Sequence, residues 1–509
     1  MKLSKTAVEF AKKHIKNFYD SDFFVKPFEF DAIWLNWTEI KKYLLEEDVG
    51  ALKVRPSLTY AVPKPKIGYR IAHQLDPLNS LTYTALAFEV AEIVEKNRMP
   101  VEKRIACSYR ISTDSKGNFF AKDNGYDDFL SRSSELAKSY SHVLVTDITD
   151  FYNQIYIHRL QNSLERCDPN FRDLSRGIER LLINFNNGAS KGIPVGPAAS
   201  IILAEASLID IDEFIVQKSE NYVRYVDDFR IFSNSRFDLE LFLHNLTKYL
   251  YNNHRLTLSS SKTEILETNK FNEKYLENPE IIEKEEIHET LAKMSDYPSH
   301  KSVEDIKALP ENSKIKIEAT VLQNLLNKII DKDVLDLGLA RHILRKAKKL
   351  RTRAIIVQLL ENFDFFSPLI RDVVLYLYEV TNTNMVKSYF HYFEKMLNES
   401  ESIKLPFVQY WMQNYFAQYP IFYTYRFIKD FISNNENKRV CALVAKKNNQ
   451  VAWVRSHKDT MYSYGPWDKR AVIFACTVLS RGEKKVLMRI VEESADLIEK
   501  SLAKLVKSR

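Results

Sequence analysis

Two adjacent carboxylates, Asp227 and Asp228, constrain this chain more than any other feature of its sequence. They lie between two short apolar runs in NYVRYVDDFRIF, residues 221–232. Such runs predict two short strands joined at the paired acids. Neighbouring carboxylates at a hairpin tip repel one another, and a divalent cation relieves that repulsion. For these residues considered alone, the alternative to a metal site is a solvated turn without a ligand.

A third carboxylate ends another apolar run. SHVLVTDI, residues 141–148, is short and rich in β-branched residues, so it predicts a buried strand that ends near Asp147. The end of a strand holds a side chain rigidly, as a metal ligand requires. The alternative is that Asp147, or Asp150, only caps the following helix.

A turn rich in glycine and proline lies between these two segments. SKGIPVGPAAS, residues 190–200, leads into a long helix predicted at 198–218. Glycine allows a backbone to approach a substrate closely. Considered alone, the segment is better explained as an ordinary turn and helix start.

Together, the three segments resemble motifs A, B and C of reverse transcriptases, in the order of that family. LTLSSSKTEIL, residues 256–266, resembles motif D with Lys262 in the lysine position. PKPKIGYRIAH, residues 63–73, resembles the basic fingers segment. The resemblance implies a fingers and palm fold that adds dNTPs by two-metal phosphoryl transfer.

The resemblance also implies roles for single residues. Two Mg²⁺ ions, for which Mn²⁺ would substitute, are expected on Asp147, Asp227, Asp228 and the backbone carbonyl of Ile148. Lys262 is expected to protonate or neutralise the leaving pyrophosphate. Tyr152 is expected to exclude a 2′-hydroxyl, with core packing as its alternative role. The remaining candidates for nucleotide binding are Lys64, Lys66, Arg70, Lys191, Gly192 and Pro197.

The second half of the chain has a different pattern. An acid-leaning connector is followed by amphipathic helical segments without a convincing strand, which predicts an array of helical repeats similar to HEAT units. The scarcity of glycine, 11 of 509 residues, agrees with a mainly helical protein. We therefore expect an α+β chain with a fingers/palm domain at 1–272, a connector at 273–310 and an all-α domain at 311–509.

Composition excludes several classes of protein. The net charge of +7 favours polyanionic partners, although it is spread over a long chain. No run of about 18 uncharged apolar residues occurs, so we expect no membrane span. The cysteines form no CxxC pair, so we expect no zinc site, no disulfide framework and a reducing cytosol; they are Cys107, Cys167, Cys441 and Cys476.

A reverse-transcriptase core followed by helical repeats resembles the abortive-infection (Abi) polymerases of bacterial phage defence. The AbiK-like group, and within it the P2-like prophage Abi polymerase, is nearest. The resemblance implies a cytoplasmic bacterial homo-oligomer that makes single-stranded DNA without a template. It also implies that a protein tyrosine primes the DNA, which stays covalently attached. Lys191-Gly192 and Gly196-Pro197 stand where motif B usually carries Gln-Gly and Ser-Pro, which casts doubt on templated fidelity.

The sequence gives weaker evidence for which tyrosine primes synthesis and for the path of the DNA product. Tyr19, Tyr43 and Tyr60 are the candidate priming residues, and ordinary packing is the alternative for each of these three among 27 tyrosines. The basic run at 341–353 would guide DNA by phosphate contacts or would form a solvated helix face. Its candidate DNA-binding residues are Arg345, Lys348 and Lys349.

Three other functions share parts of this pattern. A templated RNA-directed DNA polymerase, as in retrons, has the same five segments. A catalytically silent scaffold that binds nucleic acid is disfavoured, because the acids, Lys262 and the basic fingers segment are all retained. An RNA-dependent RNA polymerase is disfavoured by Tyr152 and by the Y-V-D-D hairpin.

Overall fold

The structure is a computed structural model of the chain. It describes residues 1–276, except 20, 22, 53, 56, 122–124 and 220, and residues 311–509, except 435–436 and 495. The chain divides into two compact units, each built from separate segments. The first contains Met1–Phe23, Thr38–Thr59 and Ala72–Ile282; the second contains Phe24–Trp37, Tyr60–Ile71 and Glu283–Arg509. Most of the predicted connector, from residue 277 to 310, lies outside the described residues, so the domain boundaries stay a prediction.

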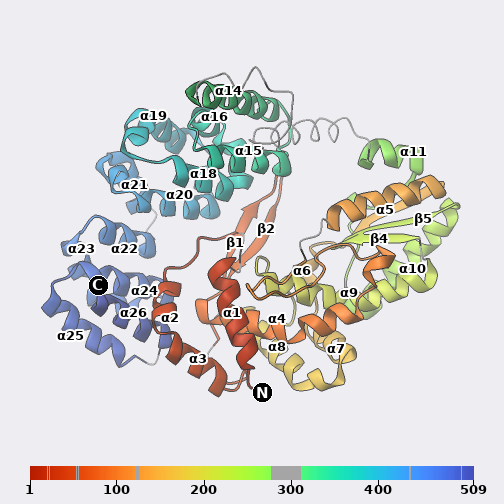
Figure 1. The fold of residues 1–509 in the computed structure, drawn as a ribbon, viewed down its shortest axis with the longest axis horizontal. Helices are drawn as coiled ribbons and strands as arrows, with labels where there is room; N and C mark the ends of the chain where they lie inside the picture. Colours follow the sequence, from red (N-terminus) through yellow and green to blue (C-terminus); the bar gives the residue numbers. More distant parts are fainter. Residues whose placement is uncertain are drawn as a thin grey trace. The chain divides into compact units, whose positions relative to one another are not determined.

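The first unit is organised around a four-stranded antiparallel sheet with the order β4-β5-β3-β6. These strands are β3 (His142–Asp147), β4 (Tyr222–Tyr225), β5 (Asp228–Ser233) and β6 (Glu264–Glu267). Helix α5 (Gly125–Ser139) covers one face of the sheet and α10 (Arg236–His254) covers the other (Figure 1). The predicted strand at 141–148 and the predicted hairpin at 221–232 are therefore confirmed.

Two long helices form the core of the rest of this unit. They are α4 (Pro77–Asn97) and α9 (Ala198–Lys218), which pack against each other. Both are apolar around most of their circumference, as expected of helices buried on several sides. The other helices of this unit include α1 (Lys5–Asn17), α6 (Phe151–Gln154), α7 (Ile157–Cys167), α8 (Arg172–Phe185) and α11 (Thr268–Phe271), and α3 (Trp37–Glu46) lies almost wholly within it.

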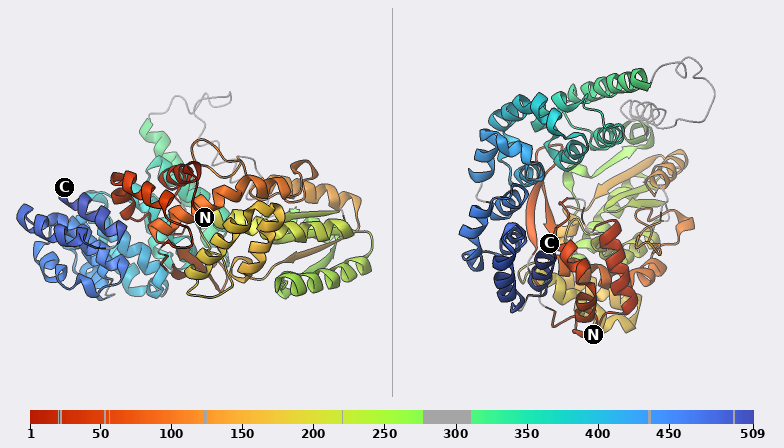
Figure 2. Two further views of the ribbon diagram at one scale, coloured as in Figure 1. Left: turned by 90° about the horizontal axis from the view of Figure 1, so that it is seen from below. Right: turned by 60° about the vertical axis from the view of Figure 1, so that its left-hand side comes forward.

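The described part of the second unit after residue 311 is helical and contains no strand, as the sequence predicts. Helices α15, α18, α20, α22, α24 and α26 pack in series, each against the next (Figure 2). Their bounds are Leu337–Leu350, Ile370–Val380, Pro406–Gln418, Lys438–Lys447, Pro466–Ala475 and Leu497–Ser508. The flanking helices are α14 (Glu311–Ile330), α16 (Ile356–Glu361), α17 (Phe363–Phe366), α19 (Thr383–Glu399), α21 (Arg426–Asn434), α23 (Val451–Lys458) and α25 (Arg481–Glu492). Serial packing agrees with a repeat array, and its identity as HEAT units stays a prediction.

Two segments from early in the sequence belong to this second unit. One includes most of the hairpin of β1 (Leu58–Pro63) and β2 (Tyr69–Gln74). The other contains α2 (Glu29–Leu35), which packs against α26. No helix among the described residues is long and apolar enough to cross a membrane.

A buried ion pair attaches α2 to the helical array. The Arg439 guanidinium donates to both carboxylate oxygens of Glu29, at 2.7 and 2.8 Å, and Glu29 is fully buried. Arg439 also lies over the Phe28 ring, 4.4 Å from its centroid. Removing one partner of such a pair leaves an uncompensated buried charge, which is more costly than the pair itself.

We therefore expect Arg439→Met to destabilise the protein by about 3–5 kcal/mol, because it leaves the Glu29 carboxylate buried without its partner. The measurement is the midpoint of urea unfolding followed by circular dichroism. The matched control is Arg455→Met, which removes an equally bidentate pair with Glu483 that lies at the surface. A surface pair contributes little, so this variant should keep nearly the wild-type midpoint. Equal shifts of the unfolding midpoint in both variants would contradict the stabilising role of the buried Arg439–Glu29 pair.

Candidate active site

The pairing of β3 with β5 brings two predicted acids together. In this antiparallel register, Asp147 lies directly opposite Asp228. Asp147 ends β3 and is only 7% exposed, so its carboxylate is held at the edge of the core. Asp150, not Asp147, precedes helix α6 at its N-cap position. The alternative in which Asp147 itself caps α6 is therefore excluded, and the side chain of Asp150 makes no capping hydrogen bond either.

Asp227 lies in the turn between β4 and β5, next to this pair. The turn is formed by Val226 and Asp227, because β5 already begins at Asp228. The Ile148 N–H donates to the Asp227 carbonyl at 3.2 Å. The chain after Asp147 is therefore hydrogen-bonded to the turn that carries Asp227.

Lys262 approaches the acids from the segment that resembles motif D. The Ser259 N–H donates to the Asp147 carbonyl at 2.8 Å, which fixes this segment beside β3. From that position the Lys262 ammonium donates to the Asp147 carboxylate. Partial burial acts to lower the pKa of Lys262, but the hydrogen bond and charge of Asp147, and the charges of Asp228 and Asp227, raise it. Lys262 therefore remains a cation at this site.

The gathered acids are in electrostatic conflict. Desolvation by surrounding protein atoms, followed by repulsion from Asp147 and Asp227, raises the pKa of the Asp228 carboxyl well above its usual value. A divalent cation would remove this conflict and favour the ionised form. No three His, Cys, Asp or Glu side chains among the described residues form a ready metal cage. The acids nevertheless fit Mg²⁺, which commonly binds through one or two carboxylates together with substrate phosphates.

Tyr152 connects this site to the glycine-rich turn. The Tyr152 carbonyl accepts from the Ile193 N–H at 2.9 Å, and Gly192 has φ +91°. A Cβ on Gly192 would lie 3.3 Å from the carbonyl oxygen of Asn153, so the close approach of the two segments favours glycine. Burial, followed by the charges of Glu205, Tyr109 and Asp227, raises the pKa of the Tyr152 phenol. Tyr152 is thus a neutral ring within electrostatic reach of Asp227.

His73 holds the other end of the glycine-rich turn. Its backbone N–H donates to the Val195 carbonyl at 2.9 Å, and its Nδ1 accepts from the Val195 N–H at 3.0 Å. Burial lowers the pKa of His73 to about 4, which keeps the ring neutral and Nδ1 able to accept. Gly196, at φ +129°, and Pro197 then lead directly into α9. Lys191 lies exposed at the start of this turn.

Several other predicted residues belong to the second unit. Tyr60 packs against the rings of Phe24, Phe407 and Tyr410, and burial raises the pKa of its phenol. Exposed basic side chains of the hairpin include Lys64, Lys66 and Arg70.

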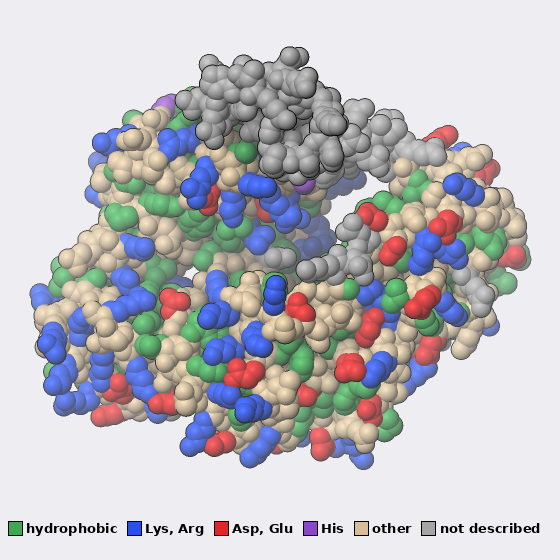
Figure 3. Space-filling view, viewed as in Figure 1, with side chains coloured by type: hydrophobic (Ala, Val, Ile, Leu, Met, Phe, Trp, Pro, Cys, Tyr) green, Lys and Arg blue, Asp and Glu red, His purple; other side chains and the backbone are tan. Residues whose placement is uncertain are grey.

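The predicted DNA-binding residues and the other two candidate tyrosines are also placed. Arg345 and Lys349 are exposed on α15, and Lys348 is half-buried there. Figure 3 shows Lys and Arg side chains over the region of α15. Tyr19, with φ +59°, and Tyr43 are half-buried in the first unit.

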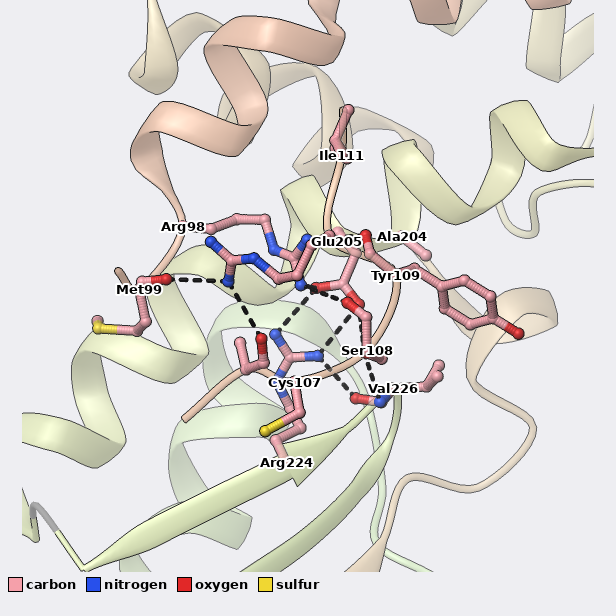
Figure 4. A network of polar contacts seen from close by, with 12 residues as sticks. Arg98, Met99, Cys107, Ser108, Tyr109, Ile111, Ala204, Glu205, Arg224 and Val226 are labelled. Atoms are coloured by element: carbon pink, nitrogen blue, oxygen red, sulfur yellow. Dashed lines mark hydrogen bonds and ion pairs between the residues drawn. The ribbon is translucent and has the colours of Figure 1, made fainter. Parts of the chain in front are cut away.

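The sequence interpretation missed a buried polar network behind the turn that carries Asp227. Arg224 and Glu205 are almost completely buried, and the Arg224 Nη2 lies 3.0 Å from Glu205 Oε2 (Figure 4). Ser108, from a loop without a recognised motif, joins them. The available signals were an arginine within the apolar strand YVRYV and a glutamate within the apolar helix at 198–218. Buried charges of this kind require partners.

Comparison with known proteins identifies the domain that carries this site. Residues 62–288 match the family described as "Reverse transcriptase (RNA-dependent DNA polymerase)". The matched range includes all five segments singled out in the sequence. No curated protein matches the chain.

Two solved telomerase structures are also similar to the chain. That of telomerase from Candida albicans with a fragment of telomeric RNA is 13% identical, covering 74% of this chain and 70% of that chain with a TM-score of 0.32. That of apo telomerase from Candida tropicalis is 11% identical, covering 75% and 74%, also with a TM-score of 0.32. On the strength of the family match, the chain contains a reverse transcriptase domain, and such a domain implies a nucleotidyltransferase.

Proposed function

We propose that this chain is a DNA polymerase whose catalytic metal ions bind Asp147, Asp227 and Asp228. The observation that carries the proposal is the placement of Asp147 opposite Asp228, beside Lys262, within a reverse transcriptase domain. Reverse transcriptase domains generally use divalent metal ions, usually Mg²⁺. The raised pKa of Asp228 supports the binding of a cation at this position.

Each residue has a distinct part in nucleotide transfer. Bound Mg²⁺, or Mn²⁺ in its place, would supply charge neutralisation for the attacking oxygen and the departing pyrophosphate. Asp147, Asp227, Asp228 and the Ile148 carbonyl would hold it. Lys262, already cationic beside Asp147, would neutralise the pyrophosphate. The neutral ring of Tyr152 would meet the sugar and exclude a 2′-hydroxyl.

The finer proposal is untemplated, protein-primed synthesis in phage abortive infection. It is supported by the helical array that follows the domain and by Lys191, which occupies the usual glutamine position of motif B. The product would be single-stranded DNA bound covalently to a tyrosine, with Tyr19, Tyr43 and Tyr60 as candidates. Arg345, Lys348 and Lys349 would contact its phosphates. We further propose that the protein acts as a homo-oligomer in the bacterial cytoplasm.

Untemplated priming predicts a product that can be seen directly. We expect the purified protein, given Mg²⁺ and one labelled dNTP without nucleic acid, to acquire label that migrates with the polypeptide in denaturing electrophoresis. Replacement of the priming tyrosine by phenylalanine should abolish this label. If incorporation instead requires an added RNA strand, the enzyme is a templated RNA-directed DNA polymerase.

The metal assignment predicts complete loss of incorporation in Asp227→Ala, because a ligand of the catalytic ions is removed. The assay is incorporation of labelled dNTP, and EDTA should abolish it in the wild type. Asp150→Asn is the matched control, since Asp150 lies three residues after Asp147 and accepts only a local hydrogen bond from Asn153. The control should retain activity. Residual polymerisation by Asp227→Ala would overturn the metal assignment.

The proposed sugar contact predicts a change in substrate selection. Tyr152→Val removes the ring and should raise the use of rNTPs relative to dNTPs by roughly 10- to 100-fold, since a pocket contact of this kind contributes about 1–3 kcal/mol to discrimination. The measurement is kcat/KM for each nucleotide. Tyr152→Phe keeps the ring and should keep the discrimination. Unchanged selection in Tyr152→Val would mean that Tyr152 only packs in the core.

A further inference from the structure

The turn that carries Asp227 has an unfavourable backbone conformation. Val226 has φ +55°, in the left-handed region. Hairpin turns that need positive φ are usually built from glycine, asparagine or aspartate, and a β-branched residue there is an outlier. Such a conformation persists only where its surroundings enforce it. Neighbouring groups must therefore hold Val226 in this conformation.

Two side chains hold the peptide groups on either side of Val226. The Val226 N–H donates to Ser108 Oγ at 2.9 Å, and the Val226 carbonyl accepts from Arg224 Nη1 at 2.9 Å. The next peptide is held as well, because the Asp227 carbonyl accepts from the Ile148 N–H. Three consecutive peptide groups around Asp227 are thus fixed from outside the turn.

Arg224 is itself held rigidly. Its Nε and Nη2 donate to the two carboxylate oxygens of Asp212, at 2.8 and 2.7 Å, and Nη2 also contacts Glu205 at 3.0 Å. Arg224 and these two acids, which both lie on α9, are buried. The guanidinium fork is planar, so these contacts fix the direction in which Nη1 points.

Ser108 is fixed by one of these acids, Glu205. Its hydroxyl donates to Glu205 Oε1 at 2.9 Å, which leaves a lone pair to accept the Val226 N–H. The backbone carbonyl of Ser108 accepts from Arg98 Nη2 at 2.7 Å, and that guanidinium also pairs with Glu205 at 2.9 Å (Figure 4). Glu205, which accepts from the serine, is therefore paired with two arginines, Arg98 and Arg224.

We propose that Ser108 and Arg224 are positioning residues that set the orientation of Asp227 toward the metal ions. They act through the backbone of Val226 and touch neither metal nor substrate. The inference rests on the proposed metal site at Asp227, and its kinetic consequence rests in addition on the proposed polymerase function. A displacement of about 1 Å in a reacting geometry costs roughly 100-fold in rate, so a small relaxation of this turn is sufficient.

The network offers a matched pair of substitutions. Ser108→Ala removes one buried hydroxyl that reaches the turn. Tyr222→Phe removes another buried hydroxyl, which donates to Asp212 at 2.7 Å and has no contact with the turn. Arg224→Lys keeps the charge but loses the fork that reaches Asp212, Glu205 and Val226 together.

The experiment measures the unfolding midpoint, the affinity for Mn²⁺ alone by calorimetry, and kcat and KM for dNTP incorporation. In Ser108→Ala we expect roughly 10-fold weaker Mn²⁺ binding and a kcat lowered roughly 10- to 100-fold with KM changed less than threefold. Arg224→Lys should show the same pattern more strongly. Tyr222→Phe should lower the midpoint by a similar amount while leaving Mn²⁺ affinity and kcat within about twofold.

The outcomes separate this inference from the proposed function. Equal effects of Ser108→Ala and Tyr222→Phe on Mn²⁺ affinity would overturn the positioning role, whether or not the wild type polymerises. Weaker Mn²⁺ binding only in Ser108→Ala, in a protein that incorporates no nucleotide, would support the positioning role and refute the polymerase. Unchanged Mn²⁺ affinity in both Ser108→Ala and Arg224→Lys would also overturn the inference.

Discussion

The antiparallel register between β3 and β5 is the constraint on which the proposed active site depends. It places Asp147 opposite Asp228, although the two residues are far apart in sequence. Side chains alternate between the faces of a strand, so a slip of one residue would move every buried side chain of β3 to the wrong face. Val143 and Leu144 are both fully buried, one on each face, so a slip would force the packing on both faces to be rebuilt around side chains of different shape. The same apolar packing that stabilises the sheet therefore aligns the acids.

This alignment brings the negative charges of Asp147, Asp227 and Asp228 together at one end of the sheet. Cationic side chains at different depths in the protein offset the negative charge of this region. Lys262 pairs with Asp147 at the site itself. In the core behind it, Arg224 pairs with Asp212 and with Glu205, and Arg98 also pairs with Glu205. The buried acids behind the site are thus paired with arginines, whereas at the site the pKa of Asp228 stays raised. A site left short of positive charge is suited to a ligand that brings its own cations, as a metal-bound triphosphate does.

Sequence reasoning was most successful where local pattern and tertiary role coincide. The apolar run before Asp147, the hairpin around Asp227 and the helix after Pro197 all appear as predicted, because each is a short segment with its own periodicity and boundary signals. The turn lies one residue earlier than expected. Its residues, Val226 and Asp227, follow no local turn preference, since tertiary hydrogen bonds hold them.

The parts that sequence reasoning missed depend on contacts between distant segments. Ser108 lies in a loop whose sequence contains no motif. Its proposed role depends on hydrogen bonds with Glu205 and Val226, which are distant from it in the sequence. Likewise, α2 reads as one more amphipathic helix near the N-terminus, yet Glu29 pairs with Arg439 more than 400 residues away. Periodicity shows that a helix has a face to bury but does not name the surface that buries it. A buried charge is more informative, because it must have a partner of opposite charge. The sequence shows Arg224 in an apolar strand and Glu205 in an apolar helix, but it does not show that these two residues pair with each other.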